Sequence, residues 1–345
     1  MWSSLDRLLR GAEIEGILVH GLGALAARRL RRLGKPVPPA LAAPERAATF
    51  AMMVAKPLLE RVRDSCDGPL VLIKGPEVAR IYPGGARTFS DVDLLVLDAA
   101  EVHRALKSRG FIEVDDPELF VDHHHLRPLR WPALGLKVEI HSGLPWPHSL
   151  EPPALTEVLE GARPSKTGIE GISAPEPVHH ALILAAHAWT HAPLGRLRDL
   201  VDVAAVAGEA VQWELDRIAR AWRIHRVWRT TRDAADGLLE GGPPPLSVRL
   251  WARHLPLVRE RTVLDNHLER WLHTFWELPP PAAFFATAGV LRQEFLPTPD
   301  EPWRDKLIRV RHAVRHPHAP LSSHVLDWEK EAMRGEVDRR RLGRH

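Results

Sequence analysis

The stretch LVLIKGPEVARIYPGGARTFSDVDLLVL, residues 70–97, decides the fold. Its first four residues are apolar and lie between two Gly-Pro pairs, and a short apolar run bounded in this way predicts a buried strand. A turn of helix is expected at 76–82. A second apolar run predicts another strand at 92–97. Two apolar strands so close together in the chain favour a sheet as the centre of the fold.

Strand and helix patterns continue to alternate after this stretch. A helix is expected at 99–109, where a glycine follows it, and further strands are expected at 111–114 and 136–141. This alternation predicts a mixed α/β unit over residues 67–150.

Helical patterns flank this unit on both sides. Before it, helices are predicted at 3–33 and 45–63, on either side of a proline-rich break. After it, helices are predicted at 176–192, 195–209, 212–238, 246–276, 281–296, 303–316 and 321–341. We therefore expect an α+β fold, in which a small mixed β-sheet core is flanked by an N-terminal helical segment and a large C-terminal helical region. The corresponding domains are 1–66, 67–150 and 151–345.

Composition excludes several classes of protein. The net charge is small, 47 − 44 = +3, so nucleic acid is not expected as a partner. The single cysteine, Cys66, excludes an intrachain disulfide and a cysteine-based zinc cluster. The N-terminus carries acidic residues and lacks an apolar run, which predicts no signal peptide. The longest apolar stretch, 16–27, is too short to span a bilayer. We expect a cytoplasmic protein without membrane contact.

Carboxylates recur at alternating positions of two predicted strands. Residues two apart on a strand share a face, so Asp91 and Asp93 project together, as do Glu139 and His141. If the two strands are neighbours, three carboxylates converge, and they repel one another unless a cation neutralises them. Oxygen ligands without cysteine favour Mg²⁺ or Mn²⁺. A plain half-buried sheet with an acidic face is the alternative.

The end of the first strand has features of a phosphate-binding loop. Gly75 allows close approach of the backbone to a phosphate, and Lys74 supplies an ammonium group. Arg87 and Ser90 are further candidates for contact with a nucleotide. Together with the carboxylates, these residues suit two-metal transfer of a phosphoryl or nucleotidyl group. Lys137 and His141 are candidates to contact the acceptor or to orient Glu139.

Other suggestive residues have simpler interpretations. The glycines of Ile17–Ala26 imitate a dinucleotide-binding fingerprint but lack its downstream acid, so Gly21 and Gly23 are interpreted as a bend or a helix-packing feature. The run Asp122-His123-His124-His125 alternates faces, so we expect at most one of its histidines to line the acceptor pocket. His187 and His191 share a helix face upstream of Asp199 and Asp202. A zinc site there is the alternative to ordinary hydrogen bonding with the next helix.

The central motifs resemble the uncharacterised nucleotidyltransferase family of the DNA polymerase beta-like superfamily. The resemblance rests on VLIKGPEVARIYPGGARTFSDVDLLV and KVEIHSGL. It extends to HGLGALAARRL and to ALILAAHAWTHAPLGRLRDLVDVAAV, and so covers about residues 10–210. It implies a nucleotidyltransferase core at 67–150. It also implies that Asp91, Asp93 and Glu139 are the metal-binding carboxylates and that Lys74 and Gly75 lie in the nucleotide loop.

The resulting hypothesis is an enzyme that transfers a nucleoside monophosphate from an NTP to a hydroxyl or phosphate group. We expect ATP as donor, Mg²⁺ or Mn²⁺ as cofactor, and a small molecule or peptide as acceptor. The alternative is a catalytically degenerate nucleotide-binding or regulatory module, which the Lys-Gly pair at the usual Gly-Ser position favours. A nucleic-acid-directed transferase has one supporting feature, an excess of 11 Lys/Arg over 6 Asp/Glu after Trp303. The oligomeric state is left open.

Overall fold

A mixed sheet forms a core of the protein, as predicted. The computed structural model describes residues 1–115, 125–297 and 301–323. In this part of the chain seven strands follow the spatial order β3-β4-β5-β2-β1-β7-β6. Their bounds are β1 (Leu70–Leu72), β2 (Asp91–Leu95), β3 (Ile112–Glu113), β4 (Leu129–Arg130), β5 (Lys137–His141), β6 (Arg163–Pro164) and β7 (Ile172–Ala174). The α+β fold class is thereby confirmed.

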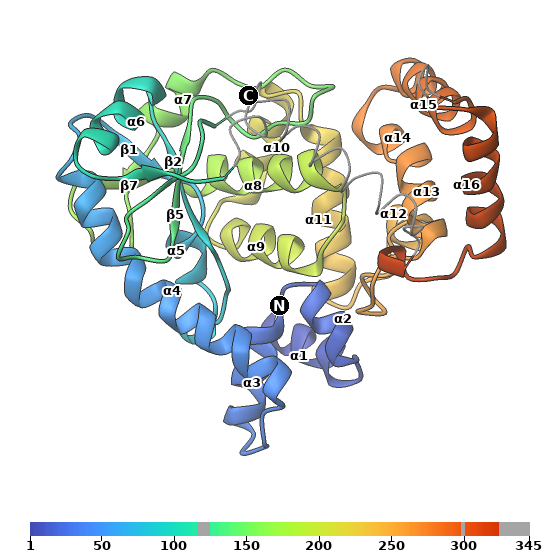
Figure 1. The fold of residues 1–345 in the computed structure, drawn as a ribbon, viewed down its shortest axis with the longest axis horizontal. Coiled ribbons are helices and arrows are strands. Elements are labelled where there is room, and N and C mark those ends of the chain that lie inside the picture. The colour runs from blue at the N-terminus through green and yellow to red at the C-terminus, as the bar shows by residue number, and fades with distance from the viewer. Residues whose placement is uncertain (116–124, 298–300, 324–345) are drawn as a thin grey trace, which may run out of the picture. The chain divides into compact units, whose positions relative to one another are not determined.

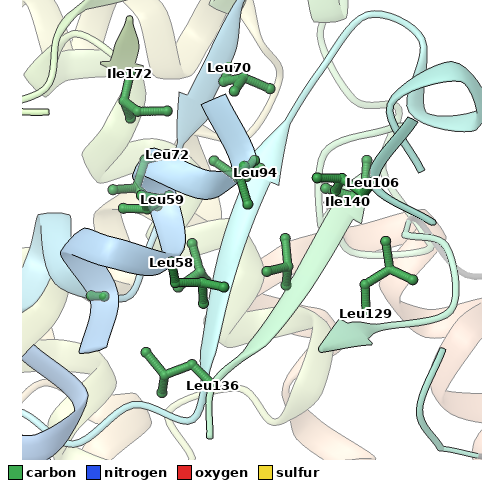
Figure 2. Close-up of a cluster of buried hydrophobic side chains, with 14 of the residues drawn as sticks. Leu58, Leu59, Leu70, Leu72, Leu94, Leu106, Leu129, Leu136, Ile140 and Ile172 are labelled. Atoms are coloured by element: carbon green, nitrogen blue, oxygen red, sulfur yellow. The ribbon is translucent and has the colours of Figure 1, made fainter. Parts of the chain in front are cut away.

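Helices cover both faces of the sheet (Figure 1). On one face, α4 (Pro39–Arg63) and α6 (Ala99–Ser108) pack over the apolar side chains of the strands. Figure 2 shows this core, in which Leu58 and Leu59 of α4 meet Leu94 of β2. On the other face lie α8 (Pro177–His191) and α9 (Leu197–Ala207). The polar positions of β2 and β5 therefore face α8 and α9, because side chains alternate along a strand.

Strand pairing sets which polar side chains meet. β2 runs parallel to β5, with Asp93 opposite Glu139 and Asp91 opposite Lys137. β1 pairs antiparallel with β2 on its other side. The two acidic strands are thus neighbours, which is the condition for convergence of their carboxylates.

The prediction of one helix over 3–33 was wrong. Three helices occupy this region: α1 (Trp2–Arg10), α2 (Ile14–Val19) and α3 (Gly23–Arg32). The second break falls at Gly21, whose φ of 70° lies in the left-handed region that favours glycine. A Cβ on Gly23 would lie 2.9 Å from Pro44, so Gly23 permits close packing of α3 on α4. Both glycines therefore serve as the predicted bend and packing feature.

The region after residue 150 is not entirely helical, contrary to the prediction. β6 and β7 extend the sheet, and β7 pairs in parallel with β1. These strands are two and three residues long, too short to give a periodic signal, and tertiary pairing stabilises them. The remaining helices of this region are α7 (Leu155–Glu160), α10 (Gln212–Ala221) and α11 (His225–Leu239). The predicted helix at 212–238 is therefore broken, at Arg223 with a φ of 56°.

The chain divides into two compact units. The first comprises Met1–Pro245 with Leu255–Val258, and the second comprises Leu246–His254 with Arg259–His345. The predicted boundaries at 66 and 150 lie within the first unit and stay predictions. No helix of the described residues is long and apolar enough to cross a membrane.

The second unit is helical in its described residues. It contains α12 (Leu246–Leu250), α13 (Val263–Leu272), α14 (Thr274–Glu277), α15 (Pro280–Phe295), α16 (Trp303–Arg315) and the 3₁₀ turn η3 (Leu321–Ser323). The single helix predicted at 246–276 is wrong, because turns separate α12 from α13. The helix predicted at 321–341 begins as η3, and the rest of it lies outside the described residues.

Candidate active site

The register of β2 and β5 gathers two acids and a histidine. Among the described residues, Asp93, Glu139 and His141 form a group whose ligand atoms all lie within 4.8 Å of one another. Asp93 lies directly opposite Glu139, and His141 is two residues further along the same face of β5. Alternation along the strands, read from the sequence, predicted this face. The pairing of the two strands brings the three side chains together.

Asp93 is the buried member of the group. Its Oδ1 accepts a hydrogen bond of 3.2 Å from Nε2 of His141. Burial raises the pKa of Asp93, but the His141 hydrogen bond and the charge of Lys74 outweigh it and lower that pKa to about 2. The second oxygen, Oδ2, is buried and has no hydrogen-bond partner in the described part of the chain. Asp93 is therefore an ionised carboxylate with an oxygen available to a ligand.

Burial and the neighbouring acids act together on Glu139. Burial, and then the charges of Asp93 and Asp91, raise the pKa of Glu139 to about 8. The pKa of Asp91 is also raised, by burial and by Asp93. A divalent cation would relieve this repulsion and coordinate the free oxygen of Asp93. The residues present thus fit a divalent metal, with oxygen ligands that suit Mg²⁺ and a histidine that Mn²⁺ also accepts.

Asp91 and its neighbours lie at the edge of this group. Asp91 lies two residues before Asp93 on the same face of β2, and so further from Glu139 than Asp93 is. It is not one of the three clustered residues. Its Oδ2 lies 3.3 Å from Oγ of Ser90. Lys137, opposite Asp91, donates to Oδ2 of Asp115 over 2.6 Å. Ser90 and Lys137 therefore both contact carboxylates beside the site.

The loop after β1 takes the shape that its Gly-Pro pair predicted. Gly75 has a φ of 61° and precedes α5 (Pro76–Ala79). A Cβ on Gly75 would lie 2.9 Å from the carbonyl oxygen of Asp91. The loop therefore crosses the first residue of β2 at a distance that glycine alone permits.

Lys74 is half-buried between the acids and α8. Its Nζ lies 2.8 Å from Nδ1 of His187. Burial lowers the pKa of Lys74, against the opposing effect of Asp93, Asp199 and Asp91. Lys74 thus lies close to the acids, and its contact with a nucleotide stays a prediction. No local pattern in the sequence indicates that His187, 113 residues away, contacts it.

Arg87 is held by a buried ion pair. Its Nε and Nη2 donate to the two oxygens of Asp202 on α9, over 2.8 and 2.6 Å. Tyr82 donates to the same carboxylate over 2.6 Å. The contact of Arg87 with a phosphate stays a prediction, and a phosphate would have to share the guanidinium with Asp202. This link was not predictable from the sequence, since no local pattern pairs residues so far apart.

The other histidines singled out in the sequence are those of the run 123–125 and the pair on α8. His123 and His124 lie outside the described residues. Nε2 of His125 lies 3.8 Å from Oε2 of Glu139, and its ring packs 5.2 Å from that of His141. On the opposite side, Nε2 of His191 is 3.2 Å from Nε2 of His187. Within the described residues no metal-ligand group forms around His187, and Asp202 is bound to Arg87.

Comparison with known proteins agrees with this geometry. The profile of a family described as uncharacterised nucleotidyltransferase matches residues 2–239, a stretch that contains the whole sheet and every site residue named above. No curated protein and no solved structure gives a significant match. Because the match spans well over half of the chain, the protein belongs to the uncharacterised nucleotidyltransferase family.

Proposed function

We propose that this protein transfers a nucleoside monophosphate from an NTP to a hydroxyl or phosphate group of a small molecule or peptide. The observation that carries the proposal is the pairing of Asp93 with Glu139 on neighbouring strands, beside the Lys74-Gly75 loop. Nucleotidyl transfer needs negative charge to hold metal and positive charge to hold a triphosphate. Both occur here on one face of the sheet.

Asp91, Asp93 and Glu139 are the proposed ligands of Mg²⁺ or Mn²⁺ in a two-metal arrangement. When bound, the ions would neutralise the triphosphate and acidify the hydroxyl of the acceptor. Asp93 suits this role because it stays ionised and keeps one oxygen free. His141 holds the other oxygen of Asp93 in place.

Lys74, Gly75, Ser90 and Arg87 are the proposed contacts of the NTP, with ATP as the expected donor. The Lys74 ammonium would exchange its contact with His187 for an oxygen of the triphosphate. Gly75 would let the backbone approach the phosphates. His141 and Lys137 remain the proposed residues on the acceptor side, and His125 joins them because it lies beside Glu139.

Binding of nucleotide provides the first test. Thermal unfolding would be measured with each of the four NTPs, with and without Mg²⁺, for the wild type, Asp93→Asn and Asp67→Asn. Asp67 is an exposed acid of the same unit and serves as a matched control. A nucleotide at 100 times its Kd adds about 2.7 kcal/mol of stability. We expect a Mg²⁺-dependent shift that Asp93→Asn abolishes and Asp67→Asn retains. No shift with any NTP in the wild type would contradict the proposal.

Transfer provides the second test. An NTP labelled at its α-phosphate would be offered with hydroxyl-bearing and phosphate-bearing small molecules and peptides. Covalent label on an acceptor, absent with Asp93→Asn, supports transfer. Mg²⁺-dependent binding without transfer to any acceptor would instead favour a degenerate nucleotide-binding module.

A further inference from the structure

A charged cleft lies among the N-terminal helices, built from residues other than those of the candidate active site. Its volume is about 540 Å³. It is formed by α1, α3, the beginning of α4 and the 3₁₀ turn η1 (Pro83–Gly85). The charged residues that line it are Arg28, Arg29, Arg31, Arg32, Asp6 and Glu45. Clefts of this size hold small molecules in other proteins, where about 300–1,000 Å³ is usual.

Positive charge exceeds negative charge in the cleft. Four arginines face two carboxylates, so the net charge of the lining is 4 − 2 = +2. Asp6 is shared, because its two oxygens lie 3.3 Å from Nε of Arg29 and 2.5 Å from Nη2 of Arg32. Glu45 binds Arg31 over 2.8 Å. The four arginines all lie in one five-residue segment of α3, residues 28–32. At this spacing on a helix, like charges repel.

Arg28 is the arginine that no carboxylate neutralises within the described residues. Its guanidinium packs directly on Gly84 of η1, where a Cβ would lie 2.0 Å from Cζ. Gly84 has a φ of 59°, in the region that favours glycine. The turn therefore leaves room for the guanidinium of Arg28 at the wall of the cleft.

Apolar side chains complete the lining. Leu25 of α3 is buried, and Trp2 of α1 packs edge-on against Tyr82 with 5.2 Å between the ring centroids. A small molecule in this cleft would thus meet an indole ring and an aliphatic side chain as well as the guanidinium groups.

We propose that this cleft is a binding site for a small molecule that carries a phosphate group. A phosphate monoester carries a charge of about −1.5 to −2 at neutral pH, which matches the excess of +2. The planar guanidinium donates paired hydrogen bonds to phosphate oxygens, and Arg28 offers it without displacing a carboxylate. Asp6 and Glu45 interrupt the positive surface, which disfavours a continuous nucleic-acid backbone as the ligand.

Calorimetric titration with inorganic phosphate and pyrophosphate tests this site. The full chain would be used in EDTA, so that divalent ions do not recruit either anion to the acids of β2 and β5. Arg28→Gln and Arg31→Gln remove cleft arginines, and Arg46→Gln removes an exposed arginine of α4 that does not line the cleft. We expect Arg28→Gln and Arg31→Gln each to weaken binding by about tenfold, as for loss of a charge-assisted hydrogen bond. Arg46→Gln should bind as the wild type does.

Asp93→Asn separates this site from the proposed nucleotide site, because the cleft should retain its affinity in that variant. A changed affinity in Asp93→Asn would place the anion at β2 and β5, where removal of a carboxylate lessens repulsion of an anion, and would overturn the proposal. Unchanged binding in both cleft variants, or equal weakening by Arg46→Gln, would also overturn it. So would preference for an RNA oligonucleotide over pyrophosphate. Arg28 is exposed, and its replacement breaks no ion pair within the described residues, so we expect the variant to fold. Circular dichroism checks this, and Arg31→Gln is the second test.

Discussion

Gly75 combines two constraints that substitution would violate. Its φ of 61° disfavours any side chain, and a Cβ would meet the carbonyl oxygen of Asp91 at 2.9 Å. That oxygen belongs to the backbone of β2 and has little freedom to move. The position therefore links the shape of the phosphate loop to the strand that carries the acids.

We predict that Gly75→Ala destabilises the protein by about 2–4 kcal/mol, from backbone strain and overpacking together. The matched control is Gly68→Ala, because Gly68 also has a positive φ, of 85°, but a Cβ there would meet nothing within 4 Å. Gly68→Ala should cost about 1 kcal/mol from strain alone. Denaturant unfolding measures both variants. Equal losses would show that contact with Asp91 contributes nothing.

The raised pKa of Glu139 predicts that the stability of the protein, freed of metal by EDTA, depends on pH. Its pKa is raised from 4.5 when unfolded to about 8 when folded. Between these values the folded state binds more protons than the unfolded state, so this residue makes stability fall as pH rises from about 4.5 to about 8. Below pH 4.5 Glu139 adds no pH dependence to stability, because it is protonated in both the folded and the unfolded state.

Glu139→Gln removes that titration. We expect the variant to gain stability over the wild type as pH rises through this window, by a few kcal/mol in all, of the order that the shift implies. Unfolding free energies at several pH values measure the gain. Glu170→Gln, at an exposed glutamate, is the control and should follow the wild type. A gain for Glu139→Gln that does not change with pH would contradict the prediction.

At the scale of elements, the Arg87–Asp202 pair joins the loop before β2 to α9. Both side chains are buried, and Tyr82 adds a hydrogen bond to the same carboxylate. Burial raises the pKa of Asp202, but Arg87 outweighs it and holds that pKa below its usual value. The contribution of Asp202 to stability is thus present above the unfolded pKa and is lost as pH falls through the folded one.

We predict that Asp202→Asn costs about 3–5 kcal/mol of stability, since it leaves the guanidinium of Arg87 buried without a counter-charge. The control is Glu209→Gln, which removes a partly exposed partner of Arg80. That variant should cost about 0–1 kcal/mol. Thermal unfolding compares the two. A loss at Asp202 no greater than at Glu209 would mean that water reaches Arg87.

At the scale of the whole molecule, the first unit contains the complete sheet and every candidate site residue. The family match ends at residue 239, within this unit. None of the described residues of the second unit belongs to the group of Asp93, Glu139 and His141.

We predict that a chain of residues 1–258, which includes both segments of the first unit, folds and keeps the NTP-dependent thermal shift. The full chain is the control, and the two midpoints should shift by similar amounts with Mg²⁺ and the preferred NTP. A folded 1–258 chain that no longer binds NTP would assign a binding role to the second unit.

Local pattern determined much of this protein. The apolar runs at Leu70 and Val92, the alternation of Asp91 with Asp93, and the Gly-Pro pair after Lys74 depend on residues near in sequence, so strands, acidic face and loop were predictable. Helix breaks such as the one at Arg223 were not, because a non-glycine residue with positive φ gives no compositional signal.

Only the tertiary structure decided how distant residues meet. The pairing of β2 with β5 selects Asp93, Glu139 and His141 as the tight group and leaves Asp91 at its edge. Packing of α8 and α9 on the sheet brings His187 to Lys74 and Asp202 to Arg87. The contacts of α8 and α9 depend on burial and charge between segments more than 100 residues apart, for which periodicity along the chain carries no information.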